Sequence, residues 1–272
     1  MKMIRIFLPG ILFYCSLIQC FASQPLSAEQ AGYAGIGTTI KTSFSAFQNP
    51  ALSAFTKNPV IGMGAENRFL IPELQSFLFQ GTLALSSTAA IGAFGTRTGT
   101  KNAFENSLGI VYGQKLSDKF YCGIEIFHHV FKVNAGEYPP TGTWSSAIGV
   151  YTKPLSFLEI GACLWNPTNF RRELKQHPFH SPTLTIGSAW KISSGLILRT
   201  ELEEKAKGSV SVISGFEYKP NDVLSIRTGY RTNPGLPAFG FGLNLNKMKI
   251  DVACMTHLTL GLYPSISISR EL

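Results

Sequence analysis

The nine residues from Ala238 to Asn246 read A-F-G-F-G-L-N-L-N, and this stretch decides the fold class. Every second residue, counted from Phe239, is large and apolar. The residues that alternate with them are Ala238 at the start and then only glycine or asparagine. The four apolar residues are Phe239, Phe241, Leu243 and Leu245. Because successive side chains of a β-strand point to opposite faces, this period of two predicts a strand with one apolar face and one small polar face.

The same alternation continues through most of the chain. From about residue 59 onward, segments of about ten residues are separated by turn sequences such as K-P-N-D at 219–222 and T-N-P-G at 232–235. We predict about fourteen strands, an even number of the length that transmembrane barrels use. Their ranges are 59–69, 74–86, 88–98, 104–116, 119–133, 142–152, 155–165, 181–191, 195–204, 209–219, 222–231, 236–246, 248–258 and 260–270.

Composition indicates which face meets which solvent. Of the 272 residues, 15% are charged and 44% are hydrophobic, whereas an ordinary soluble domain carries about one quarter charged residues. The second face of each strand is mostly glycine, serine, threonine, alanine and asparagine, with single ionisable residues. We therefore predict an all-β fold, an antiparallel transmembrane β-barrel whose apolar face meets lipid and whose closure removes exposed strand edges. A secreted soluble β-sandwich is the alternative.

The first 22 residues have the features of a secretory signal peptide. Two cations precede an apolar run at 6–17, and Ala22 stands where signal peptidase cuts. A lipoprotein cut before Cys20 is the alternative. Removal of Lys2 and Arg5 with this segment changes the formal net charge from +8 to +6. The remaining cations are scattered along the sequence, which does not favour nucleic acid as a partner. We predict export to the outer membrane.

Residues 23–58 differ from the alternating remainder. We expect them to form a plug inside the lumen or, alternatively, a periplasmic segment, with the barrel over 59–272. A short helix is expected over 42–55, and Pro50 would interrupt it or start a second turn. Its apolar face would consist of Phe44, Phe47, Leu52 and Phe55.

Ionisable residues on the small polar parity are predicted to line the lumen, because charges are kept off the lipid face. They either pair with one another or form a polar path or binding site. Arg199 beside Glu201 and Glu203 suggests a salt bridge. The predicted lumen residues are Glu66, Arg68, Glu125, His129, Glu159, Arg199, Glu201, Glu217, Arg227, Arg231, Asp251 and His257.

Catalytic and cofactor motifs give little support to an enzyme. Ser188-Ala189-Trp190-Lys191 matches S-x-x-K, but that motif requires a helix and here lies on a predicted strand. A loop metal site at His177-x-x-His180 has Pro178 between its histidines. A hydrolase of the phospholipase type would need a Ser/His/Asn set at the membrane rim. We predict a non-enzymatic protein without metal or cofactor.

The segment Asn49-Pro50-Ala51-Leu52-Ser53, ahead of the first strand, resembles an element of FadL-type and PorV/PorQ-type outer-membrane proteins. Later motifs in the same order strengthen the resemblance, among them Asn166-Pro167-Thr168, Gly215-Phe216-Glu217-Tyr218 and Thr232-Asn233-Pro234. The chain departs from this group in two ways: it lacks the glycine after Ala51, and it ends Arg270-Glu271-Leu272 without a terminal aromatic residue.

The resemblance implies a barrel of fourteen strands and two functions of different classes. FadL moves hydrophobic molecules, so one prediction is passive transport of a small hydrophobic molecule. PorV and PorQ serve type IX secretion and surface attachment, so the alternative is a secretion component with a protein cargo. Lipid of the outer membrane is a partner in both. A transporter should hold bound lipid or detergent in its lumen, whereas a secretion component should co-purify with proteins.

Overall fold

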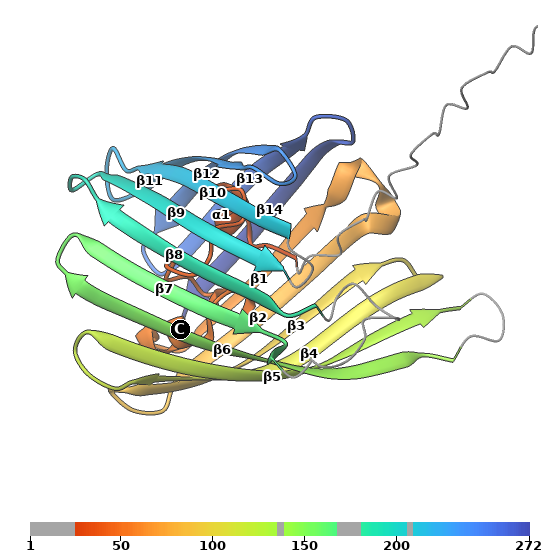
Figure 1. Cartoon of the computed structure of the whole chain (residues 1–272), viewed down its shortest axis with the longest axis horizontal. Coiled ribbons are helices and arrows are strands. Elements are labelled where there is room, and N and C mark those ends of the chain that lie inside the picture. The colour runs from red at the N-terminus through yellow and green to blue at the C-terminus, as the bar shows by residue number, and fades with distance from the viewer. Residues whose placement is uncertain (1–24, 135–138, 168–180, 206–208) are drawn as a thin grey trace, which may run out of the picture.

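A computed structural model describes residues 25–134, 139–167, 181–205 and 209–272, so the predicted signal peptide and His177-x-x-His180 lie outside the described residues. Fourteen antiparallel strands pair in chain order, and β1 pairs with β14 to close the barrel (Figure 1). The strands are β1 Val60–Asn67, β2 Gln75–Ala84, β3 Ala89–Gly99, β4 Ala103–Lys115, β5 Phe120–Val133, β6 Thr141–Leu155, β7 Leu158–Trp165, β8 Thr183–Lys191, β9 Leu196–Lys205, β10 Ser209–Tyr218, β11 Leu224–Arg231, β12 Leu236–Leu245, β13 Met248–His257 and β14 Gly261–Glu271. The predicted fold class is confirmed, and each predicted strand has a counterpart whose ends differ by at most a few residues.

The two parities of each strand face opposite sides of the wall. On β12, Phe239 and Phe241 are each 47% exposed on the outer surface, whereas Gly240 and Gly242, which follow them, are buried. The same outward parity carries large apolar side chains on all the other strands, which together form an apolar belt. Water would penalise such a belt, but the hydrocarbon of a bilayer requires it. Within the described ranges, no helix is long and apolar enough to span a membrane.

The two ends of the barrel differ. At one end, which we name the turn end, the strands are joined by the short connections 85–88, 116–119, 156–157, 192–195, 219–223 and 246–247. At the other, the loop end, the connections 100–102, 232–235 and 258–260 are as short, but 68–74, 134–140 and 166–182 are longer. The connection 68–74 contains the 3-10 turns η3 Arg68–Leu70 and η4 Pro72–Leu74. Short turns at one end and longer loops at the other are typical of outer-membrane barrels.

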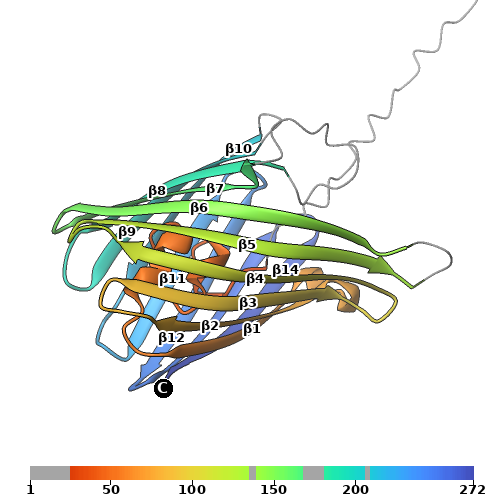
Figure 2. The same ribbon diagram turned by 90° about the horizontal axis from the view of Figure 1, so that it is seen from below.

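The segment 25–58 lies inside the barrel, where Figures 1 and 2 show it in red and orange between opposite walls. We name it the plug. It contains the helix α1 Ala28–Ala31 and the 3-10 turns η1 Ser45–Phe47 and η2 Pro50–Phe55. Ser27 and Gln30 form a capping box on α1, which satisfies backbone donors that are buried here. In place of one helix over 42–55 the structure has two 3-10 turns, and Pro50, which lacks an N–H group, starts the second turn, one of the two outcomes predicted for it.

Glycines on the wall let the plug backbone approach closely. A Cβ atom at Gly149 on β6 would overlap the Asn49 side chain, and one at Gly161 on β7 would overlap the carbonyl of Thr38. In the space so created, Asn49 Nδ2 donates to Thr38 O at 2.9 Å and to Val150 O at 3.0 Å. Asn49 also caps η2 by accepting from the Ala51 amide at 3.1 Å. The motif at 49–51 therefore fastens the plug to β6.

Candidate functional site

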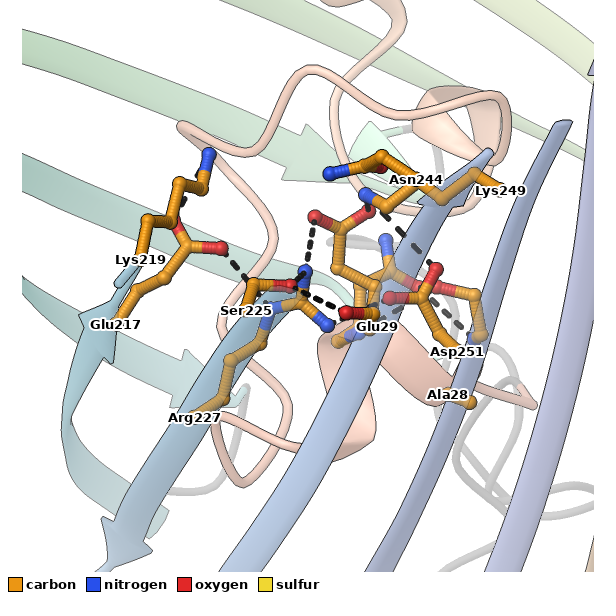
Figure 3. Close-up of polar contacts among 12 residues, drawn as sticks. Ala28, Glu29, Glu217, Lys219, Ser225, Arg227, Asn244, Lys249 and Asp251 are labelled. Carbon is orange, nitrogen blue, oxygen red and sulfur yellow. Dashed lines mark hydrogen bonds and ion pairs between the residues drawn. The ribbon is translucent and has the colours of Figure 1, made fainter. Parts of the chain in front are cut away.

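Arg227 on β11 is the centre of a buried ion network. Its side chain is 1% exposed in a barrel interior, so its charge needs several partners. Nε lies 3.1 Å from Glu217 Oε1 on β10, and Nη1 lies 2.6 Å from Asp251 Oδ1 on β13. Nη2 donates to Ser225 Oγ at 2.7 Å. Figure 3 shows how these side chains converge from neighbouring strands.

The plug contributes a carboxylate to this network. Glu29 of α1 lies 2.6 Å from Lys249 Nζ and 3.4 Å from Arg227 Nη2 (Figure 3). Burial by itself would raise the pKa of Glu29, but the charges of Lys249 and Arg227 outweigh it and lower the pKa to about 2. Glu29 is therefore ionised at neutral pH and joins the plug to β11 and β13.

Three further charged residues of the wall bind the plug. Glu201 Oε2 accepts from the Thr38 amide at 2.9 Å and from Thr38 Oγ1 at 2.6 Å. Arg199 Nη1 donates to Thr39 O and Thr39 Oγ1, each at 3.1 Å. The salt bridge suggested between Arg199 and the neighbouring glutamates is therefore wrong, because the plug supplies partners to Arg199 and Glu201 instead. Glu159 lies 2.9 Å from Lys41 Nζ of the plug.

The remaining predicted lumen residues lie nearer the loop end or apart from the network. Glu66 pairs with Arg68 at 2.7 Å, and Arg231 pairs with Glu203 at 2.8 Å. Glu125 is 1% exposed and has no hydrogen-bond partner among the described residues. His257 is half-buried, with its ring centroid 6.1 Å from that of Phe69. A polar path or a binding role for the predicted residues stays a prediction.

His129 joins two strands through a short polar chain. Its Nδ1 lies 2.8 Å from Ser107 Oγ, and its Nε2 lies 2.5 Å from Glu105 Oε1, both on β4. The sequence predicted His129 as lumen-facing but gave no sign of these two partners. In the part of the chain that the structure describes, no group of three metal-ligating side chains is assembled.

An apolar cluster fills part of the other side of the interior. Strands β2 to β7 and the plug form a buried cluster of Phe44, Ala46, Phe47, Leu78, Phe94, Val111, Phe127, Ala147, Cys163 and Trp165. Aromatic rings follow one another across the wall, with centroids 6.1 Å apart for Phe94 and Phe127 and 6.0 Å apart for Phe127 and Trp165. Phe47 of the plug packs on Phe94 at 5.1 Å. The interior thus has an apolar cluster on β2 to β7, although Glu125, His129 and Glu159 lie buried on the same strands, and an ion network on β10, β11 and β13.

Two cavities open at the turn end. The larger, of about 420 Å³, lies between η2 and the β2–β3 and β4–β5 turns, with Phe55, Leu85 and Tyr121 among its lining residues. The smaller, of about 240 Å³, lies over the ion network and includes Glu29, Lys41 and Arg227. Plug residues line both cavities, so a shift of the plug would change the size of both cavities at the turn end.

The barrel matches solved outer-membrane proteins over most of its length. The crystal structure of the Pseudomonas putida toluene transporter TodX is 12% identical, covers 92% of this chain and 99% of that chain, and has a TM-score of 0.70. A Pseudomonas aeruginosa FadL homologue is 10% identical, covers 90% and 98%, and has a TM-score of 0.65. The chain shares the fold of the FadL and TodX barrels. A TodX deletion mutant, described as a monoaromatic hydrocarbon channel, is 12% identical, covers 91% and 99%, and has a TM-score of 0.73.

Sequence comparison adds nothing to this structural likeness. No family model matches the chain. No curated protein matches it either. At these identities the likeness to solved structures establishes the fold, and function has to be argued from the interior of the barrel.

Several residues of the interior were missed by the sequence analysis. Glu29 and Lys41 belong to the plug, whose sequence shows no strand alternation to orient them. Three lysines alternate in step with the inward residues of their strands but lie at or next to strand ends, where the alternation is least clear. They are Lys191, Lys219 and Lys249. The parity rule, extended to the first and last residues of each strand and to the residues next to them, would have found these three lysines.

Proposed function

We propose that the protein is an outer-membrane β-barrel that lets a small hydrophobic molecule pass passively through its interior. The observation that carries the proposal is the apolar cluster of the lumen, where the rings of Phe94, Phe127 and Trp165 form a row with centroids about 6 Å apart. Such a row favours apolar solutes, whereas a porin for polar solutes requires a polar interior. The solved structures of similar fold, described as a toluene transporter and a monoaromatic hydrocarbon channel, agree with this class of cargo.

The plug would regulate this passage. Strand pairing continues around the whole barrel, and the plug lies inside it, in contact with the apolar cluster and with the ion network. A solute that travels through the lumen therefore requires the plug to shift. The protein needs no energy source for such passage, since the solute moves down its gradient. No observation in the described residues favours the secretion alternative or a protein cargo, and we do not propose either.

Uptake into cells tests the proposal. A lipopolysaccharide layer slows apolar compounds, so the rate at which the apolar dye N-phenyl-1-naphthylamine enters should rise when the protein is produced. Replacing Phe94, which is buried in the lumen, with Asn should reduce that rate, whereas the control Phe79→Asn on the outer surface should not, provided that both barrels fold. Folding is checked by the difference in gel mobility between unheated and heated samples. Equal dye entry with and without the protein would refute the proposal.

A further inference from the structure

The smaller cavity at the turn end has an excess of positive charge. Its lining includes six cations and three carboxylates, which leaves three positive charges uncompensated within the lining. The cations are Lys41, Lys191, Arg199, Lys219, Arg227 and Lys249, and the carboxylates are Glu29, Glu159 and Glu217.

Each of the three carboxylates is shared between two cations. Glu159 lies between Lys41 at 2.9 Å and Lys191 at 3.6 Å. Glu217 lies between Arg227 at 3.1 Å and Lys219 at 3.5 Å. Glu29 in the same way lies between Lys249 and Arg227. Asp251 behind the lining also pairs with Arg227 and Lys249, which lowers the excess to about two positive charges.

Arg199 differs from the other cations of the lining in its direct partners, and its guanidinium carbon lies 5.6 Å from the centroid of the Tyr33 ring. Its side chain is 7% exposed, and among the described residues no carboxylate lies within salt-bridge distance of its guanidinium. It bonds Thr39 through Nη1, while Nε is buried without a hydrogen-bond partner in the described part of the chain. The buried Nε–H group therefore costs free energy unless a hydrogen-bond acceptor, such as an anion in the cavity, approaches it.

We propose that this cavity binds a small dianion of phosphate type, as free phosphate or as a phosphomonoester. The charge excess matches a dianion, and ammonium and guanidinium groups are the usual phosphate ligands in proteins. The donors come from the plug, through Lys41, and from the wall, through Lys191, Arg199 and Lys219. A bound dianion therefore also ties the plug to the wall. This site goes beyond the proposed passage of hydrophobic molecules and does not depend on it.

Calorimetric titration of the detergent-folded protein with inorganic phosphate, at fixed ionic strength, tests the site. We expect saturable binding that weakens by about tenfold or more in Arg199→Gln and in Lys219→Gln. Lys247→Gln is the matched control, because Lys247 lies exposed at the same end outside the cavity. A parallel titration with glycerol 3-phosphate shows which source of the dianion binds more tightly.

Two results would overturn the proposal. One is the absence of saturable heat with either phosphate compound. The other is the same affinity in Lys219→Gln and Lys247→Gln, since screening of a general positive surface would not distinguish the two lysines. Lys219 is half-exposed at a strand end, so its replacement keeps the test valid even if Arg199→Gln fails to fold. Failure here leaves dye uptake unaffected, so the two proposals fail separately.

Discussion

The Glu29 carboxylate of the plug lies 2.6 Å from the Lys249 ammonium on β13, and both side chains are largely withdrawn from water. The two residues are far apart in sequence, so this ion pair exists only while the plug is docked. Removing one partner of a buried pair leaves the other charge with less compensation, which is the costly part of such a change. The pair is therefore a point at which plug docking can be weakened without touching the barrel wall.

Glu29→Gln should loosen the plug. The substitution removes the negative charge but keeps the size of the side chain, and loss of a charged hydrogen bond costs about 1.5–3 kcal/mol. Amide hydrogen exchange of α1 should therefore become at least about tenfold faster. Glu73→Gln, at an exposed position in the 68–74 loop, is the control and should leave that exchange unchanged. Unaltered exchange in Glu29→Gln would show that the pair does not hold the plug.

Acid should have the same effect on the natural protein. Because the pKa of Glu29 is lowered from about 4.5 to about 2 by Lys249 and Arg227, against the effect of burial, the docked plug favours the ionised form. Its contribution to docking is complete above about pH 4.5 and is lost as the pH falls toward 2. Hydrogen exchange of α1, corrected for the intrinsic pH dependence, should accelerate over this window. Glu29→Gln should show a smaller change, and an equal change in both proteins would assign the effect to other groups.

A side chain at Gly149 should displace the plug. A Cβ there overlaps Asn49, whereas a Cβ at Gly81 on β2 meets only Ile61 Cγ2 at 3.9 Å. We expect Gly149→Leu to keep the heat-dependent gel mobility of a folded barrel but to raise the single-channel conductance, since the segment that fills the lumen no longer fits. Gly81→Leu is the control and should conduct like the natural protein. If the two variants conduct alike, the contact at Asn49 does not position the plug.

The strands could be predicted because the alternation that defines each strand lies within about ten consecutive residues. A period of two fixes which residues share a face, and the outward phenylalanines of β12 and the inward Arg227 both follow from it. The partners could not be predicted in the same way. Parity places Arg199 and Glu201 on one face, and the sequence suggests that they pair. In the structure both bind plug residues whose position depends on the folded lumen.

The plug itself shows the same limit. Asn49-Pro50-Ala51 is recognisable in the sequence. The place where it packs, however, depends on Gly149, about one hundred residues further along the chain, because any side chain there would overlap Asn49. A glycine on the polar face of a strand fits a lumen lining equally well with or without a plug against it. Only the packed structure distinguishes these cases.

Arginine on the apolar belt should cost more at its middle than at its edge. Phe241 lies in the middle of β12 and is 47% exposed on the outer surface, whereas Leu245 ends the strand at the turn end. An arginine facing lipid costs about 2–4 kcal/mol at the bilayer midplane and about 0–1 kcal/mol near the interface. Phe241→Arg should therefore lower the fraction of protein that shows heat-dependent mobility, and Leu245→Arg should leave it nearly unchanged. The reverse order would mean that the belt does not face lipid.

The chain Ser107–His129–Glu105 should not act as a catalytic triad. Its distances of 2.8 Å and 2.5 Å are those of a nucleophile, a base and an orienting acid. Ser107, however, lies inside β4 and pairs with Thr96 on β3 and with His129 on β5, so the backbone donors around it serve the strand ladders. Without free donors an oxyanion would not be stabilised, which removes a factor of about 10²–10³ for each donor. We expect no labelling of the folded barrel by a fluorophosphonate. Labelling that disappears in Ser107→Ala and persists in Ser145→Ala would instead establish an esterase in the lumen.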